Sequence, residues 1–297
     1  MKTKIKDAII LSVISGNANE TAVTVKTQFA ESNGRKIAYR SIGQGEAIIL
    51  NNRFRANLDD WDPAFLDALA KDYRVITFNY SGFASSTGPL NTDLKGFAKD
   101  AIDLADALGI DKFIVGGWSL GGFVAQLVAV EIPERINQLI LLGTKPAGEV
   151  QHPLEQIFID TAYKPDYTVE DETILFFDPS SEISRKAAVD SHNRIAQRVD
   201  KDPRVAPELW GSYGAAFEDF TNDPYNIRQK LQETDVPVLV VSAQHEVCFA
   251  PENWFELNQK LPTTQLIVIP QVGHGPQQQY PELIAGYIHN FIQIIKK

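Results

Sequence analysis

Short continuous apolar runs alternate along the chain with stretches in which apolar residues recur at helical spacing. A strand covered on both faces carries apolar side chains throughout, so the continuous runs predict buried parallel strands. The stretches with helical spacing predict amphipathic helices that pack on the sheet. We therefore expect strands within residues 46–50, 73–80, 112–117, 136–144, 236–243 and 264–270, and helices within residues 62–72, 93–109 and 123–134.

This alternation predicts an α/β fold, a mostly parallel sheet flanked by helices. Near the start, residues 23–31 and 35–43 alternate apolar and polar side chains, which predicts a hairpin. Residues 149–235 are helical, aromatic and polar in pattern, without a buried strand run. We interpret them as a helical cap inserted into a core formed by residues 24–148 and 236–297, lying over the open end of the sheet.

Residues 1–23 form an N-terminal extension with two interpretations. Lys2, Lys4 and Lys6 precede a short apolar run, and Gly16 with Ala18 resembles a small-residue cleavage site, so the segment could be a signal peptide for export to the periplasm. Because the apolar run is short for a signal peptide, we expect a cytoplasmic protein. No apolar run in the sequence reaches the roughly 18 residues that predict a membrane span.

Charge and cysteine content narrow the classes of partner. The chain has 38 acidic and 28 basic residues, a net charge of −10, which argues against nucleic acid because phosphate backbones would be repelled. A single cysteine, Cys248, excludes an internal disulfide and a multi-cysteine metal site. We expect a small-molecule substrate and neither a metal nor an organic cofactor. The sequence does not predict the oligomeric state.

One motif carries candidate chemistry. Residues 117–121, Gly-Trp-Ser-Leu-Gly, fit the pattern G-x-S-x-G, directly after a predicted strand and directly before a helix. A serine on such a strand-to-helix turn is held exposed at a helix N-terminus, where backbone amides favour developing negative charge. Ser119 is therefore the candidate nucleophile. The alternative is that Ser119 is only the N-cap of the helix.

A serine nucleophile needs a base, and the base needs a carboxylate to orient it. His274 follows the last predicted strand, at the sheet edge where Ser119 is expected. The expected chain order is serine, acid, histidine. Glu246, which follows the strand at 236–243, is the candidate acid, with Glu149 as a second choice.

Four segments together resemble the α/β-hydrolase fold family, in its serine-nucleophile branch. They are the second predicted strand with the loop after it, the turn with Ser119, the acid loop and the histidine loop, at residues 73–88, 111–122, 241–253 and 271–276. The resemblance extends over residues 24–297. It implies a hydrolase that needs no cofactor and cleaves a carboxylic ester or similar acyl bond through an acyl-enzyme intermediate.

The chain departs from the family where a His-Gly pair usually follows a core strand. This chain has Asn52 and Arg53 there, followed by Phe54. The resemblance implies that the oxyanion is held by the backbone N–H groups of Phe54 and Leu120. Arginine in place of glycine puts the geometry of this loop in question.

Three nearby side chains are candidates for substrate binding. Arg53 or Arg55 could hold an anionic group of the substrate, since guanidinium pairs well with carboxylate, and the alternative is a surface salt bridge for each. Trp118 could line the acyl pocket, and the alternative is core packing. Aromatic residues of the cap could line the same pocket: Phe158, Tyr163, Phe176, Phe177, Trp210, Tyr213 and Phe217.

Two other functions remain compatible with these residues. One is a receptor-like protein on the same fold that binds a ligand with little turnover. The other is hydrolysis of a C–C bond, or perhydrolysis, by the same three residues.

Overall fold

The computed structural model describes residues 20–295 of the chain. The signal peptide considered for residues 1–18 lies outside this range. No helix in the described range combines the length and the apolar character that crossing a bilayer requires.

A single eight-stranded sheet forms the centre of the molecule, in the order β1-β2-β4-β3-β5-β6-β7-β8. The first two strands pair antiparallel with each other, β2 pairs antiparallel with β4, and the remaining pairs are parallel. The predicted mostly parallel sheet is confirmed. The strands are β1 (Gln28–Ser32), β2 (Arg35–Ile42), β3 (Ala47–Asn51), β4 (Arg74–Phe78), β5 (Phe113–Trp118), β6 (Ile136–Leu142), β7 (Val238–Ala243) and β8 (Thr264–Ile269).

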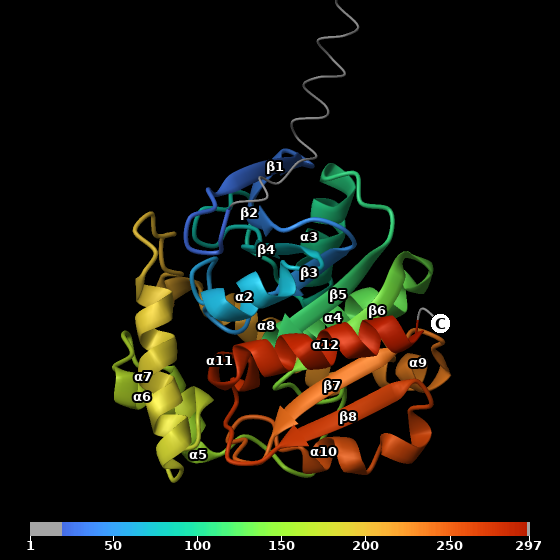
Figure 1. The fold of residues 1–297 in the computed structure, drawn as a ribbon. Coiled ribbons are helices and arrows are strands. Elements are labelled where there is room, and N and C mark those ends of the chain that lie inside the picture. Colours follow the sequence, from blue (N-terminus) through green and yellow to red (C-terminus); the bar gives the residue numbers. More distant parts are fainter. Residues whose placement is uncertain (1–19, 296–297) are drawn as a thin grey trace, which may run out of the picture.

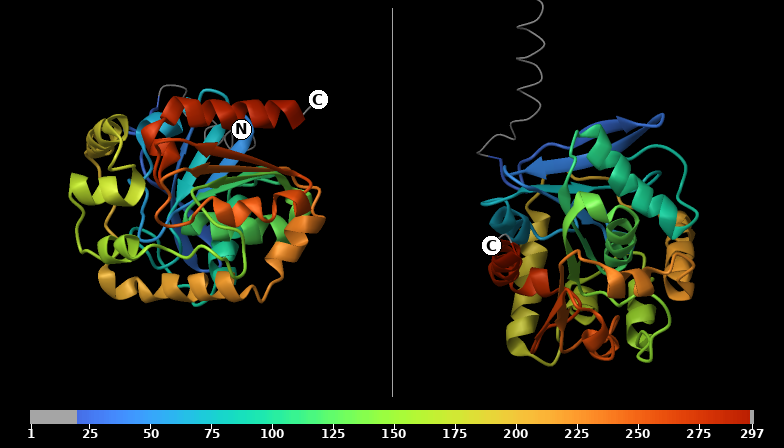
Figure 2. Two further views of the ribbon diagram at one scale, coloured as in Figure 1. Left: turned by 90° about the horizontal axis from the view of Figure 1, so that it is seen from below. Right: turned by 90° about the vertical axis from the view of Figure 1, so that its right-hand side faces the viewer.

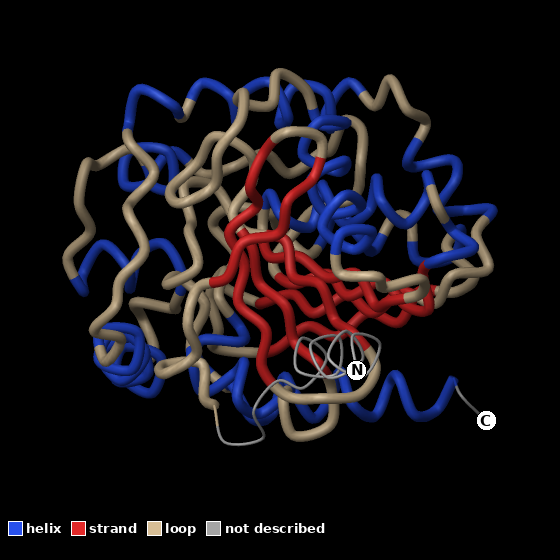
Figure 3. The backbone as a smooth tube through the Cα atoms, turned by 90° about the horizontal axis from the view of Figure 1, so that it is seen from above, coloured by secondary structure: helices blue, strands red, loops and turns tan. Residues whose placement is uncertain are grey.

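Helices cover both faces of the sheet, as the buried strand runs require (Figures 1 and 3). One face carries α2 (Pro63–Leu69) and the C-terminal helix α12 (Pro281–Ile295), which pack against each other. The other face carries α3 (Leu94–Ala107) and α4 (Leu120–Glu131). Figure 2 shows α12 on one side of the strands and α3 and α4 on the other.

Five α-helices lie between β6 and β7, where the sequence predicts the cap. They fall into two groups. Figure 1 shows α5, α6 and α7 beyond the ends to which the arrows of β7 and β8 point. By contrast, α8 packs on α3 and α4, and α9 packs on α4, so both extend the layer of core helices. The five are α5 (Gln156–Ala162), α6 (Val169–Phe176), α7 (Glu182–Ala196), α8 (Gly211–Asn222) and α9 (Ile227–Glu233).

Short helices complete the described chain. Of these, α11 lies in the loop that leads from β8 into α12. The short α-helices are α10 (Glu252–Phe255) and α11 (Pro276–Gln279), and the 3-10 helices are η1 (Pro133–Arg135), η2 (Pro207–Leu209) and η3 (Asn258–Lys260).

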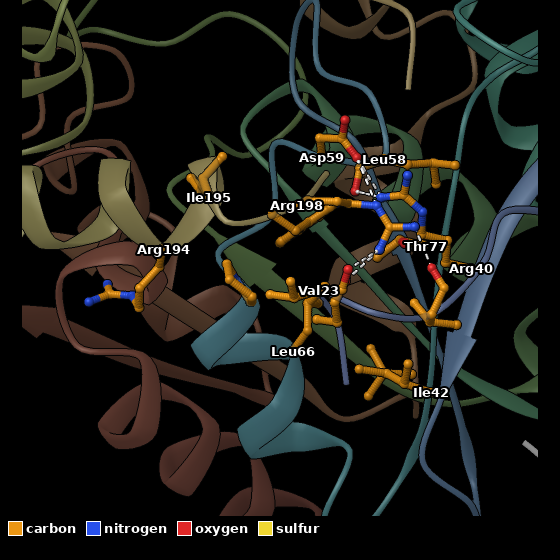
Figure 4. Close-up of a pocket in the computed structure, with 15 residues that line it drawn as sticks. Val23, Arg40, Ile42, Leu58, Asp59, Leu66, Thr77, Arg194, Ile195 and Arg198 are labelled. Atoms are coloured by element: carbon orange, nitrogen blue, oxygen red, sulfur yellow. Dashed lines mark hydrogen bonds and ion pairs between the residues drawn. The ribbon is translucent and has the colours of Figure 1, made fainter. Parts of the chain in front are cut away.

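A buried cluster of charge ties the end of α7 to the core (Figure 4). Asp59 Oδ1 lies 2.6 Å from Nη1 of Arg40 on β2 and 3.5 Å from Nε of Arg198, just beyond α7. Arg198 also donates to the carbonyl oxygens of Ala22 and Val23, both at 2.9 Å. The N–H groups of Thr24 and Val25 bond to the carbonyl of Thr21, so this part of the predicted strand forms a turn, and β1 starts at Gln28 and not at residue 23 as predicted.

Candidate active site

Ser119 occupies a strained turn between β5 and α4. Its φ of 59° and ψ of −124° lie outside the regions that L-residues favour, as a sharp strand-to-helix turn requires. Its side chain makes no capping hydrogen bond to the helix, so the N-cap alternative does not describe this serine. Glycine is required nearby, because a Cβ on Gly121 would lie 2.0 Å from the carbonyl oxygen of Asn51.

Glu246 and His274 meet in the loops that follow β7 and β8. His274 Nδ1 lies 2.8 Å from Oε1 and 2.9 Å from Oε2 of Glu246, and both side chains are buried. Glu246 Oε1 also accepts the backbone N–H groups of Cys248 at 2.9 Å and Phe249 at 3.1 Å, which fixes the carboxylate within its own loop. The alternative acid, Glu149, is exposed at the end of the segment that follows β6.

The second ring nitrogen of His274, Nε2, is buried and has no hydrogen-bond partner within residues 20–295. In the described part of the chain, this nitrogen therefore makes no hydrogen bond to Ser119. Such bonds are often long in ligand-free enzymes and shorten when substrate binds. The ring is held edge-on by Phe158 and Phe249, with centroids 5.7 and 5.6 Å away.

Trp118 connects the turn that carries Ser119 to the histidine loop. Its indole Nε1 donates a 2.7 Å hydrogen bond to the backbone carbonyl of His274. The side chain is 1 % exposed and is not among the described residues that line the cavity beside Ser119, which is the core-packing alternative of the two that the sequence left open. The residue next to the nucleophile thereby sets the position of the candidate base, a contact that G-x-S-x-G spacing does not reveal.

The loop after β3 reaches Ser119 because of strand register. Asn51 pairs with Gly117, so the chain leaving β3 passes beside the turn at the end of β5. Phe54 and Leu120 line the same cavity as Ser119. In the described range, neither the Phe54 nor the Leu120 backbone N–H donates a hydrogen bond to a protein group, as expected for groups that could receive a ligand oxygen.

Arg53 holds this loop instead of reaching toward a substrate. Its guanidinium donates to the Phe54 carbonyl at 2.9 Å and to Asp60 at 2.7 Å. The carbon atom at its centre lies 5.1 Å from the ring centroid of Trp118 and 4.8 Å from that of Phe176. Arg53 does not line the cavity beside Ser119, so the structure places it away from the predicted anion contact.

Arg55 likewise has partners within the protein. Its guanidinium donates to the backbone carbonyls of Ala162 at 2.9 Å and Pro165 at 2.7 Å, at and just beyond the end of α5. It also stacks on the rings of Tyr167 and Trp210, at 4.3 and 4.2 Å. Arg55 therefore fastens the cap to the loop after β3 and does not line the cavity beside Ser119.

The cavity at Ser119 has a volume of about 270 Å³ and largely apolar walls. Four of the predicted cap aromatics line it: Phe158, Tyr163, Tyr213 and Phe217. The other three, Phe176, Phe177 and Trp210, do not.

Two lining aromatics were not predicted, although the sequence holds a signal for each. Phe123 lies four residues after Ser119, on the same face of α4. Phe249 lies three residues after Glu246, in the acid loop itself. Across residues 20–295, no three His, Cys, Asp or Glu side chains gather closely enough to hold a metal ion.

Comparison with known proteins gives consistent results. A family model described as alpha/beta hydrolase fold matches residues 46–279. A putative 2-succinyl-6-hydroxy-2,4-cyclohexadiene-1-carboxylate synthase from Bacillus subtilis is 24% identical, covering 84% of this chain and 91% of its own length. A pimeloyl-[acyl-carrier protein] methyl ester esterase from Vibrio campbellii is 26% identical, covering 85% and 97%.

Solved structures match over nearly the whole chain. An alpha/beta hydrolase fold protein from Chitinophaga pinensis superposes with a TM-score of 0.80 at 28% identity, covering 92% of this chain and 99% of its own.

Proposed function

Because this chain belongs to the α/β hydrolase fold family, we propose that it hydrolyses a carboxylic ester, with Ser119 as nucleophile, His274 as base and Glu246 as the acid that orients it. The observation that carries the proposal is the buried contact of 2.8 Å between His274 Nδ1 and Glu246. The other ring nitrogen of His274, Nε2, has no partner in the described structure. The loop that carries His274 is hydrogen-bonded to Trp118, the residue next to Ser119. The esterase among the relatives supports an ester as the bond cleaved.

The proposed reaction follows from the roles of these atoms. His274 Nε2 takes the proton of the Ser119 hydroxyl as the oxygen attacks the ester carbonyl, and Glu246 stabilises the imidazolium that forms. The N–H groups of Phe54 and Leu120 bind the negative oxygen of the tetrahedral intermediate, at roughly 3 kcal/mol for each donor.

Collapse of this intermediate breaks the bond to the alcohol, which takes the proton from His274. The acyl group then remains on Ser119. Water attacks the acyl-enzyme in the same way, giving its proton to Nε2, and the carboxylic acid leaves as the Ser119 oxygen takes that proton back.

Steady-state hydrolysis of p-nitrophenyl butyrate tests this proposal. We expect Ser119→Ala to lower kcat by more than about 10⁴-fold, since the nucleophile is lost. Glu246→Gln should lower it by roughly 10⁴-fold, because an amide favours the wrong histidine tautomer. Ser242→Ala removes another buried serine hydroxyl that has no partner in the described structure, and it should leave kcat within twofold.

Two results would contradict the proposal. Full activity in Ser119→Ala would mean that the nucleophile lies elsewhere. Stoichiometric binding of the ester by the wild-type protein without release of p-nitrophenol would instead support the receptor-like alternative.

A further inference from the structure

The cavity beside Ser119 presents no formal charge to a ligand. None of the described residues that line it is Asp, Glu, Lys, Arg or His. Much of the wall is formed by the rings of Phe123, Phe158, Phe217 and Phe249. Burial raises the pKa of the one lining thiol, that of Cys248, well above its usual range, so this group is neutral as well.

Three cations with neighbours in the cavity wall have partners of their own. Arg53 is held by Asp60 and Arg55 by the carbonyls that follow α5. The third cation, Lys145, is buried behind the cavity wall: its Nζ lies 5.7 Å from the ring of Phe123 and 5.6 Å from that of Phe217. Because both rings line the cavity and Lys145 does not, the rings stand between the ammonium group and a bound ligand.

The position of the cavity indicates which half of an ester it receives. The carbonyl oxygen would lie between the N–H groups of Phe54 and Leu120, and both residues line the cavity. The leaving oxygen must face His274 Nε2 to receive its proton, and the cavity borders this ring only through Phe158 and Phe249. Because the lining residues run from Phe54 and Leu120 to α5 and α8, we place the acyl chain in this cavity.

The volume sets the length of that chain. An apolar protein cavity of about 150 Å³ holds one benzene molecule, six non-hydrogen atoms. In proportion, 270 Å³ accommodates roughly eleven such atoms. An acyl group of about eight carbons with its carbonyl oxygen, about nine such atoms, fits within this space.

From these four observations we propose that the substrate is an ester of an uncharged acyl group of about eight carbons, and that an acyl chain ending in a carboxylate is rejected. The inference rests on the proposed function. A carboxylate placed in this cavity would lose water and meet no positive charge, only neutral hydroxyl groups such as that of Tyr213, which is unfavourable.

Matched esters test the proposal on the wild-type protein. Across p-nitrophenyl esters from acetate to dodecanoate, kcat/KM should rise by up to roughly fourfold for each methylene, peak near octanoate and then fall. The mono-p-nitrophenyl ester of octanedioic acid, which has the same chain length and a terminal carboxylate, should be at least roughly 100-fold poorer than the octanoate ester. Equal rates for this pair would overturn the proposal while leaving ester hydrolysis intact.

Two alanine substitutions distinguish the effect of charge on substrate preference from the effect of cavity volume. Phe217→Ala removes a ring that shields Lys145, so it should raise kcat/KM for the octanedioate ester relative to the octanoate ester by at least tenfold. Phe158→Ala empties a comparable volume at α5, and its ring is not among those that contact Lys145 in the described range, so it should favour longer chains and leave the discrimination against carboxylate unchanged. The same loss of discrimination in both variants would contradict the shielding role.

Ligand binding tests the assignment of the cavity even if the protein hydrolyses no ester. Calorimetry on Ser119→Ala with the methyl ester of octanoic acid and the monomethyl ester of octanedioic acid should show binding of the neutral ligand only. Absence of turnover with this binding pattern would overturn the proposed function and support the assignment of the cavity. Equal binding of both ligands would overturn the assignment itself.

Discussion

The ammonium group of Lys145 is enclosed by aromatic rings, and its charge lowers the stability of the native state at neutral pH. Its Nζ lies 5.2 Å from the ring of Phe220 and donates to the carbonyl of Gly148 at 3.0 Å. Burial, reinforced by the positive charge of Arg228, lowers the pKa of Lys145 to about 8. In the unfolded chain the pKa of a lysine returns to about 10.4. The native state therefore loses this proton at a lower pH than the unfolded state does.

This difference predicts that stability rises with pH between about 8 and 10. In that window the unfolded chain holds a proton that the native state has lost, so raising the pH favours the native state by up to about 1.4 kcal/mol per pH unit. Lys145→Met should remove this rise. The free energy of unfolding in urea, measured from pH 7 to 10, provides the test.

The exposed Lys112 provides the matched control for that measurement. Lys112→Met should keep the slope of the wild-type protein. A slope in Lys145→Met equal to that of the wild type would show that the native ammonium is not destabilised by its surroundings.

At the residue scale, a side chain with a motif of its own is easier to propose from sequence than the charged side chains beside it. The motif around Ser119 makes this serine the candidate nucleophile, whereas Arg53 and Arg55 have partners within the protein that no motif indicates. A guanidinium bonds to whatever the fold brings near it. For Arg55 this is Pro165, 110 residues away in the chain, and no local pattern encodes that contact.

At the scale of elements, the turn from β5 into α4 depends on close backbone contact. A Cβ on Gly117 would lie 2.0 Å from the carbonyl oxygen of Gly121. A Cβ on Gly121 would lie equally close to the carbonyl of Asn51, on the neighbouring strand. Both contacts are with backbone atoms, which cannot rotate away as the end of a side chain can.

Two glycine-to-alanine substitutions in helices test this requirement. Gly121→Ala in α4 should destabilise the protein by about 3 kcal/mol or more, because the helix must move from β3 to relieve the clash. Gly286→Ala in α12 meets no atom within 4 Å and should stabilise by about 0.5–1 kcal/mol through helix propensity. Thermal unfolding of both variants gives the comparison, and similar effects in the two would refute the argument from close contact.

The elements of the core were largely predictable and those of the cap were not. Buried strands can be recognised in the sequence as continuous apolar runs, since both of their faces are covered. In the predicted cap, α8 and α9 instead pack on α3 and α4. Their polar and aromatic sequences specify amphipathic helices without specifying which apolar surface they cover.

At the scale of the molecule, the candidate site exists because parallel strands end at one edge of the sheet. Ser119, Glu246 and His274 follow β5, β7 and β8, and Phe54 follows β3. This convergence could be predicted because the rule depends only on topology. The shape of the cavity could not, because it depends on how α5 and α8, which both contribute lining residues, pack against the core.

Covalent labelling with an alkyl fluorophosphonate, followed by mass mapping of the labelled peptide, tests the central claim that Ser119 is an activated nucleophile. The account predicts one adduct per folded chain on the peptide that contains Ser119, with loss of fluoride. It predicts no adduct in Ser119→Ala or in heat-unfolded protein. A label on another residue, or equal labelling of Ser119→Ala, would contradict it.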